Sequence, residues 1–190
     1  MSEVCDWCGS DEQYRRYHDD EWGRPCRDDD KLFEFLILES AQAGLNWLTI
    51  LRKREGYRRL FANFSAQRVA AFTPADTERL MADPAIVRNR MKIESAINNA
   101  QRFLEVQQEY GSFAHYLWGF VEHRPIQNQW QSLADVPATT SLSDSISKDM
   151  KKRGFRFFGS TICYAYLQAM GLVNDHMVTC PAHQQCAALA

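Results

Sequence analysis

The sequence predicts an all-α fold, and three observations support that prediction. Apolar residues recur at three- and four-residue spacing, as they do on the buried face of a helix. Many of these stretches begin at a capping residue and end at a glycine, which are ordinary start and stop signals of helices. Apolar and polar residues do not alternate at period two over any long stretch. We therefore expect many helices and few or no strands.

The first helices are marked by their caps. An acidic run from Asp28 to Asp30 opens a helix that ends at Gly44. Acidic side chains suit the positive end of the helix dipole, and glycine suits a C-cap. Asn46, a good N-cap, opens the next helix, which continues toward Phe61.

The later helices follow the same signals. Thr73-Pro74 and Asp83-Pro84 are pairs of a capping residue and proline, which predict the starts of two short helices. Residues 91–110 carry an apolar face and end at Gly111, which predicts a long helix. After it we expect a short aromatic helix over residues 112–121 and a loop over residues 125–140. Two further helices should follow, over residues 141–154 and 160–170.

Length and composition limit the class of protein. The chain has 190 residues, of which 45% are hydrophobic and 24% charged. These are globular proportions, and they exclude collagen-like and disordered chains. A chain of this length buries roughly 70% of its unfolded surface, so we expect one compact domain over residues 1–190, with room for two helical lobes and a pocket between them. Lys and Arg number 22 against 24 Asp and Glu, a net charge of −2, which argues against strong non-specific binding to polyanions but not against local basic patches.

The sequence gives no reason to place the protein in or across a membrane. No apolar run approaches the ~20 residues of a membrane span. The first residues have neither the basic nor the apolar region of a signal peptide. We expect a cytoplasmic protein, whose six cysteines are thiols or metal ligands rather than disulfides.

Candidate metal ligands gather at the two ends of the chain. They are Cys5, Cys8 and His18 near the start, and His176, Cys180, His183 and Cys186 near the end. In a helix, His176 and Cys180 would lie one turn apart. Zinc prefers four Cys or His ligands in a tetrahedron, and here it would tie the chain ends together. Spacing alone chooses neither between Cys5 and Cys8 nor between the His176–Cys180 pair and the tail that follows it, and free thiols with surface histidines are the alternative.

Glu39 is the first candidate for chemistry. Its helix is apolar nearly all the way round, and no Lys or Arg lies within one turn of it. A buried carboxylate without a partner must find a hydrogen bond or shift its pKa. Glu39 is therefore a candidate ligand-binding group, with a solvated seam of the helix as the alternative.

An aromatic cluster lies in the polar first quarter of the chain, and its members are Trp7, Tyr14, Tyr17, Trp22 and Trp47. Flat rings near carboxylates suit a planar, electron-poor guest, which they bind by stacking and cation–π attraction. The alternative for each ring is ordinary core packing.

Two groups of basic residues could face a polyanion. One spans residues 52–59, and the other spans residues 148–156 and precedes a segment with two glycines, Gly154 and Gly159. A helix, a tight turn and a second helix with free first amides can hold a phosphate on backbone N–H groups. This pattern resembles a helix-hairpin-helix element, which binds DNA without reading its sequence. Solvated charged faces are the alternative.

Taken together, these segments closely resemble one family. The matching blocks are Tyr14-x-x-Tyr17-His18-Asp-x-Glu-Trp22-Gly23, Leu38-Glu39-x-x-Gln42-Ala43-Gly44-Leu45-x-Trp47, Lys152-Arg153-Gly154-Phe and Gly171-Leu-Val-Asn-Asp175-His176. In this order, from Cys5 to Cys180, they resemble the 3-methyladenine DNA glycosylase I family. The resemblance implies an all-α, divergent helix-hairpin-helix DNA glycosylase fold with a zinc site that ties the N- and C-terminal ends together.

The resemblance also implies a ligand set and an activity. One structural Zn2+ would be bound by Cys5, His18, His176 and Cys180, which leaves Cys8, His183 and Cys186 without a role. Family members remove 3-methyladenine from alkylated double-stranded DNA and release the free base. A base inside the stack is out of reach, so the nucleotide must be flipped into a pocket.

Each site residue has an implied role. Trp47 would stack on the flipped cationic base, Glu39 would accept a hydrogen bond from its edge with Tyr17 alongside, and Trp7, Tyr14 and Trp22 would form the walls. Gln42, Gly44 and Leu45 match the plug and wedge that hold the gap in the DNA open. The DNA backbone would contact Lys152, Arg153, Gly154, Gly159, Ser160 and Thr161.

The chemistry asks little of the enzyme, because methylation at N3 already makes the base a good leaving group. No lysine is placed for a Schiff base, so we expect a monofunctional, water-using, monomeric glycosylase. Glu39 is the expected catalytic carboxylate, and Asp175 is expected to orient His176 instead. A DNA-binding module without catalysis and an enzyme acting on a free purine-like cation are the alternatives. The wedge at Leu45 separates them, since a free ligand needs no wedge.

Overall fold

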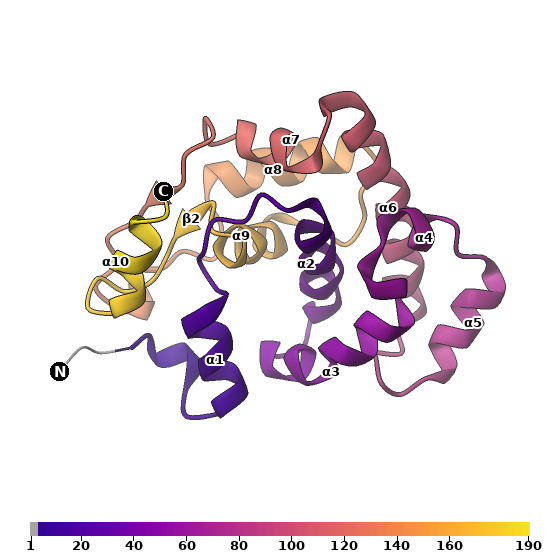
Figure 1. The fold of residues 1–190 in the computed structure, drawn as a ribbon, viewed down its shortest axis with the longest axis horizontal. Helices are drawn as coiled ribbons and strands as arrows, with labels where there is room; N and C mark the ends of the chain where they lie inside the picture. The colour runs from indigo at the N-terminus through magenta and orange to yellow at the C-terminus, as the bar shows by residue number, and fades with distance from the viewer. Residues whose placement is uncertain (1–3) are drawn as a thin grey trace.

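The computed structural model describes residues 4–190 and is mostly helical, as predicted (Figure 1). The expectation about a signal peptide rests partly on residues 1–3, which lie outside the described part. The helices are α1 (Glu12–Asp20), α2 (Asp29–Gln42), α3 (Trp47–Leu60), α4 (Ala66–Ala70), α5 (Pro74–Ala82), α6 (Arg90–Tyr110), α7 (Phe113–Gly119), α8 (Ser141–Lys152), α9 (Ser160–Ala169) and α10 (Pro181–Ala187). Short 3-10 turns cover Asp6–Cys8, Ala62–Phe64 and Leu133–Asp135. No helix among residues 4–190 is both long and apolar enough to cross a membrane.

Helix α2 is the centre of the core. Every residue from Leu32 to Ala41 is buried, and the helix packs against α3, α6, α7 and α9. Its cap is the one the sequence predicts, since the Asp28 carboxylate accepts a hydrogen bond from the Lys31 amide. Asn46 caps α3 in the same way. These caps fix where α2 and α3 begin, and the candidate site lies where α2 ends and α3 begins.

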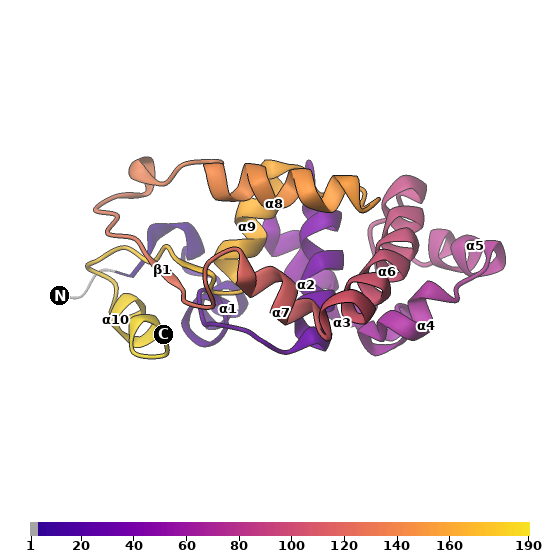
Figure 2. The same ribbon diagram turned by 90° about the horizontal axis from the view of Figure 1, so that it is seen from above.

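The two chain ends meet at one end of the molecule, and α4 and α5 lie at the other (Figures 1 and 2). Two very short strands contribute to this arrangement. β1 (Ile126–Gln127) pairs in parallel with β2 (Val173–Asn174). The pairing attaches the segment before α8 to the segment that carries Asp175 and His176.

The structure corrects one local prediction. No helix begins at Asp83-Pro84, because the Asp83 carboxylate accepts a hydrogen bond from the Ala85 amide and forms a turn. His176 and Cys180, whose spacing would place them one turn apart in a helix, lie in a turn over residues 176–180, with the Cys180 amide bonded to the carbonyl of Met177. The sequence patterns of caps and apolar spacing did not predict α1, α4 or α10.

Candidate active site and metal centre

Four buried side chains converge where the chain ends meet. The ligand atoms of Cys5, His18, His176 and Cys180 all lie within 4.8 Å of one another. The turn at residues 176–180 brings His176 and Cys180 together, although it is not helical. The structure thus contains a buried Cys2His2 group that could hold a metal ion.

The spacing of these atoms fits a small tetrahedral ion. Nδ1 of His176 lies 3.1 Å from Nε2 of His18 and 3.7 Å from Sγ of Cys5, and Sγ of Cys180 lies 3.7 Å from Nε2 of His18. Ordinary zinc bond lengths in a tetrahedron place two nitrogens about 3.3 Å apart and nitrogen and sulfur about 3.5 Å apart. The four donors therefore already have nearly the right separations.

The outer contacts of the group are those of metal ligands. The second ring nitrogen of His18 lies 2.7 Å from the Asp19 carboxylate, and that of His176 lies 3.0 Å from the carbonyl of Trp22. Metal-binding histidines usually bond a carboxylate or carbonyl through the nitrogen that is not coordinated. Hydrogen bonds from the Cys5 thiol and from the two imidazoles hold the pKa of the Cys180 thiol well below its usual range, which favours the thiolate that a metal needs.

The rival ligands lie outside the group. The thiol of Cys8 donates to the carbonyl of Cys5 at 3.1 Å, and the ring of His183 lies 2.8 Å from the carbonyl of Asn128. Cys186 is buried in α10 and is not a member of the group. Of the candidates that spacing left open, the fold thus brings together Cys5, His18, His176 and Cys180.

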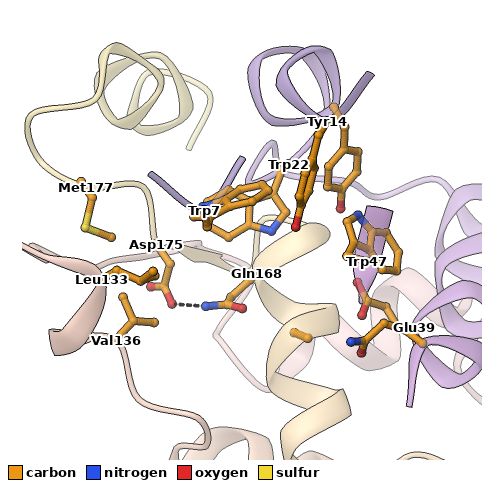
Figure 3. Close-up of a pocket in the computed structure, with 13 residues that line it drawn as sticks. Trp7, Tyr14, Trp22, Glu39, Trp47, Leu133, Val136, Gln168, Asp175 and Met177 are labelled. Carbon is orange, nitrogen blue, oxygen red and sulfur yellow. Dashed lines mark hydrogen bonds between the residues drawn. The ribbon is translucent and has the colours of Figure 1, made fainter. Parts of the chain in front are cut away.

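A cavity of about 240 Å³ lies beside the metal group. Its lining is aromatic and acidic: Trp7, Tyr14, Tyr17, Trp22, Glu39, Gln42, Trp47, Leu133, Val136, Ala165, Gln168, Asp175 and Met177. The cavity unites the aromatic cluster with Glu39, as predicted from the sequence (Figure 3). No Lys, Arg or His belongs to this lining within residues 4–190. A planar cation would be attracted here, and an anion would be repelled.

Glu39 projects from α2 into this cavity (Figure 3). Its side chain is 4% exposed, and no hydrogen bond to it forms within the described part of the chain. Burial raises the pKa of Glu39 to about 8. Near neutral pH the carboxyl is therefore largely protonated, and a cationic guest would favour its ionised form.

Two indole N–H groups also lack partners. Nε1 of Trp7 and Nε1 of Trp47 are buried without a hydrogen bond to any group of residues 4–190. Buried donors without a partner are costly. Both rings line the cavity, so a guest with acceptor atoms could satisfy these donors.

Asp175 was expected to orient His176, but no hydrogen bond joins the two residues in the described part of the chain. Asp175 instead lines a polar wall of the cavity that the sequence analysis did not predict. The Asp175 carboxylate accepts hydrogen bonds from Asn128, Trp130, Tyr164 and Gln168 at 2.5–2.9 Å. The amide nitrogen of Gln168 points at Asp175, so its carbonyl oxygen turns the other way, toward the cavity (Figure 3). A glutamine near the end of α9, after a run of apolar and aromatic residues, is the one signal that could have singled out Gln168.

The predicted DNA-contacting residues lie on two turns. Gln42, Gly44 and Leu45 form the turn between α2 and α3, where Leu45 is 39% exposed. Residues 153–159 connect α8 to α9, Lys152 and Thr161 are exposed, and Gly159 caps α9 without a side-chain hydrogen bond. Ser160 is bonded through its hydroxyl to Asp144.

Arg153 is held by other side chains. Its guanidinium donates to Asp149 and Glu109 at 2.8 and 2.7 Å and to the hydroxyl of Tyr110 at 2.8 Å. A phosphate contact by Arg153 would have to displace these two carboxylates.

The raised pKa of Glu39 predicts how stability depends on pH. The folded protein keeps this proton up to about pH 8, whereas an ordinary glutamate loses it near 4.5. Between these pH values the folded state binds more protons than the unfolded state, so the free energy of unfolding falls as the pH rises. We expect Glu39→Gln to remove this loss and to be more stable than wild type at pH 8.5 by about 2–4 kcal/mol, since one pKa unit is about 1.36 kcal/mol.

Urea unfolding at pH 5 and pH 8.5 tests this expectation. The advantage of Glu39→Gln should be small at pH 5 and large at pH 8.5. An equal difference between the two proteins at both pH values would show that Glu39 has an ordinary pKa.

Solved structures of glycosylases share this fold. A crystal structure of 3-methyladenine DNA glycosylase I matches with a TM-score of 0.93 and 48% identity, covering 95% of this chain and 100% of the other. The Staphylococcus aureus 3-methyladenine DNA glycosylase I, described with its recognition of 3-methyladenine, matches with a TM-score of 0.93 and 40% identity, covering 96% and 97%. The fold is that of a DNA glycosylase.

Sequence comparison narrows the class. A family model described as methyladenine glycosylase matches residues 7–183. The chain is 49% identical over 178 residues to DNA-3-methyladenine glycosylase 1 of Escherichia coli (strain K12), covering 94% of this chain and 95% of the relative. This chain belongs to the methyladenine glycosylase family, which confirms the resemblance read from the motif blocks.

Proposed function

We propose that this protein is a monofunctional DNA-3-methyladenine glycosylase that flips 3-methyladenine out of alkylated double-stranded DNA and hydrolyses its N-glycosidic bond. The observation that supports this best is the cavity, which combines aromatic walls, two carboxylates and no basic side chain in its described lining. A 3-methyladenine base is planar and cationic while it is attached to the sugar. It leaves as a neutral molecule, so the enzyme needs selection and modest stabilisation of the transition state.

Base recognition follows from the lining. Trp47 stacks on the base, with Tyr17 packed 5.6 Å away, centroid to centroid, and Trp7, Tyr14 and Trp22 close the walls. As the cation approaches, Glu39 loses its proton to solvent, and its carboxylate accepts a hydrogen bond from the amino edge of the base. The unpaired indole N–H groups of Trp7 and Trp47 can donate to acceptor atoms of the flipped nucleotide.

DNA is held outside the cavity. Leu45 enters the gap left by the flipped base, with Gln42 and Gly44 as the plug. Lys152 and the backbone at Gly154, Gly159, Ser160 and Thr161 contact the phosphates. Arg153, because it is already ion-paired, holds the hairpin in position more than it contacts DNA.

One Zn2+ is the ion that fits the Cys5, His18, His176 and Cys180 group. With four protein ligands it has no open coordination position, so it supplies structure and no chemistry. Its effect on the site is indirect, because the ring of Trp22 packs 4.7 Å from that of His176 and the ring of Trp7 packs 5.3 Å from that of His18.

The direct test is base release. Alkylated duplex DNA incubated with the wild-type protein should release free 3-methyladenine and leave 7-methylguanine in place, measured by chromatography of the released bases. DNA binding without release would contradict the proposal and favour a non-catalytic binding module.

Replacing Leu45 tests the wedge. We expect Leu45→Gly to lower kcat/KM on alkylated duplex DNA at least about tenfold, because no other side chain then fills the gap, while binding of free 3-methyladenine changes by less than about twofold. Tryptophan fluorescence measures the binding of the free base. Leu189→Gly, which removes another exposed leucine, is the matched control. Equal losses for duplex and free base in Leu45→Gly would favour an enzyme that acts on a free purine.

A further inference from the structure

The segment that carries the plug is a type II β-turn. Ala43 has φ −48° and ψ 118°, Gly44 has φ +79°, and the Leu45 amide donates to the carbonyl of Gln42 at 2.7 Å. A type II turn requires a positive φ at its third residue, which glycine adopts without strain. The turn therefore explains why a glycine stands at this position.

Packing does not hold this turn in place. A Cβ atom on Gly44 would meet nothing within 4 Å, and Leu45 is 39% exposed. The helix before the turn is different, since α2 is buried up to Ala41. The conformation of the turn must then depend on its hydrogen bonds. In one of them, the side-chain Nε2 of Gln42 donates to the backbone carbonyl of Leu45 at 2.6 Å.

Lys92 supplies the other bonds from a distant part of the chain. Its Nζ donates to the carbonyls of Ala41 and Ala43 at 2.8 and 2.6 Å. The Ala41 carbonyl is one of those that the end of α2 leaves unpaired. The Ala43 carbonyl belongs to the central peptide of the turn, and this peptide points in opposite directions in type I and type II turns. A donor fixed on that carbonyl selects the type II form.

The position of Lys92 is not explained by its own helix. Lys92 lies in the first turn of α6 (Arg90–Tyr110), where the helix dipole disfavours a cation. It forms no ion pair with any residue from 4 to 190, and partial burial lowers the pKa of its ammonium group. The positive charge of Lys92 is stabilised instead by the C-terminal end of α2, which is the negative end of that helix dipole. These costs are consistent with a lysine placed for its effect on the α2–α3 turn.

We infer that Lys92 is a positioning residue that holds the Gln42–Leu45 turn in the type II form in which Leu45 is presented to DNA. The inference rests on the proposed function for the wedge. Lys92 acts through the turn and touches neither the base nor the reacting bond. It connects α6 to the α2–α3 turn, so the wedge is set before DNA arrives and no ordering cost is incurred on binding.

Lys92→Met tests this, because methionine keeps much of the length of the side chain and removes every donor. We expect kcat/KM on alkylated duplex DNA to fall about tenfold or more, equivalent to about 1.4 kcal/mol, while fluorescence-detected binding of free 3-methyladenine changes less than about twofold. The matched control is Gln101→Met, since Gln101 also lies in α6 and donates to a backbone carbonyl, that of Ala70 at 3.2 Å, and lies outside the cavity lining. Gln101→Met should retain wild-type activity.

Two further measurements separate this role from others. The NMR signal of the Gly44 amide should shift or broaden in Lys92→Met and stay in place in Gln101→Met. The slope of log affinity for duplex DNA against log salt should be unchanged, whereas loss of a phosphate contact would reduce it by about one.

The outcomes distinguish the two levels of the proposal. If the wild-type protein releases no base, the proposed function fails. With an active wild type, three results would overturn the positioning role of Lys92 and leave the glycosylase assignment standing. Lys92→Met could be as active as wild type, it could weaken free-base binding as much as duplex activity, or it could show the reduced salt slope.

Discussion

The Glu39→Gln enzyme is expected to release 3-methyladenine from alkylated duplex DNA at least about 100-fold more slowly than wild type, a loss of about 2.7 kcal/mol. Glutamine has the same shape and keeps a carbonyl acceptor, so the main change is the loss of a negative charge. At a buried position such as that of Glu39, one fixed charge facing a developing charge has an effect of this size. Burial is what makes Glu39 effective, because the same carboxylate in water would be screened.

A second buried glutamate on α2 provides the control. Glu34 is also 4% exposed, but it is paired with Arg54 at 2.7 Å and with Lys31 at 3.4 Å. Glu34→Gln should lose stability, because the partners of a partly buried ion pair are left uncompensated, and should keep its rate of base release. Glu39→Gln should instead gain stability and lose its rate of base release.

Single-turnover rates of base release and urea unfolding midpoints, measured for Glu39→Gln and Glu34→Gln, test whether the Glu39 carboxylate assists the reaction. If Glu39→Gln released base as fast as wild type with its fold intact, the carboxylate would not be the group that assists the reaction. If both variants lost activity in proportion to their stability, the effect would belong to the helix and not to the site.

The helical framework could be predicted from the sequence because its signals are local. A cap at Asp28, a helix apolar on all sides and a glycine at position 44 suffice to place α2 and to bury Glu39. The aromatic cluster was likewise visible in the sequence, and the fold brings all its members into one cavity. The failed helix at Asp83-Pro84 shows the limit of such signals, since the same residue pair also starts a turn.

Contacts between distant residues could not be predicted in this way. Asp175 is bonded by Asn128 and Trp130, which lie in a segment predicted only as a loop. Lys92 reaches across about fifty residues of sequence to Ala41 and Ala43, and its own helix gives no reason for it. Periodicity describes which face of an element is buried, but it does not say what that face meets.

The choice between Cys5 and Cys8 as a candidate metal ligand likewise depends on contacts that sequence patterns do not reveal. Spacing offered Cys5 and Cys8 equally, and the resemblance to the family pointed to Cys5. In the structure, the turn over Asp6–Cys8 directs the Cys8 thiol to the carbonyl of Cys5 and leaves the Cys5 thiol beside His176. A single 3-10 turn therefore determines which of the two cysteines lies in the Cys2His2 group.

Loss of the metal is expected to have the second large effect, this time on stability. An ion bound about 1,000-fold more tightly than its free concentration contributes about 4 kcal/mol. For a chain of this size that corresponds to a fall in Tm of about 8–16 °C. Calorimetry of the wild-type protein before and after removal of the metal by a chelator measures this shift, and metal analysis should give one zinc per chain beforehand.

Cysteine variants assign the effect to the site. Cys180→Ser should bind no zinc and should show the lowered Tm without a chelator. Cys8→Ser is the matched control, because Cys8 is equally buried and lies next to the site but has its thiol bonded to a carbonyl. Zinc retained in Cys180→Ser, or lost equally in both variants, would contradict the ligand set. So would a wild-type protein that contains no zinc when it is purified without chelator.

Exchange of the ion then separates structure from chemistry. In the proposed site four protein ligands would close the coordination sphere, and the aromatic walls contact two of these residues through the Trp22 carbonyl on His176 and the packing of Trp7 on His18. Metal-free protein should therefore lose affinity for free 3-methyladenine together with stability, and Zn2+ should restore both. Cd2+, which also takes tetrahedral thiolate and imidazole ligands, should restore base release to within about twofold of the zinc enzyme. A catalytic ion would change the rate with its identity, so a large difference between the zinc and cadmium enzymes would contradict a purely structural role.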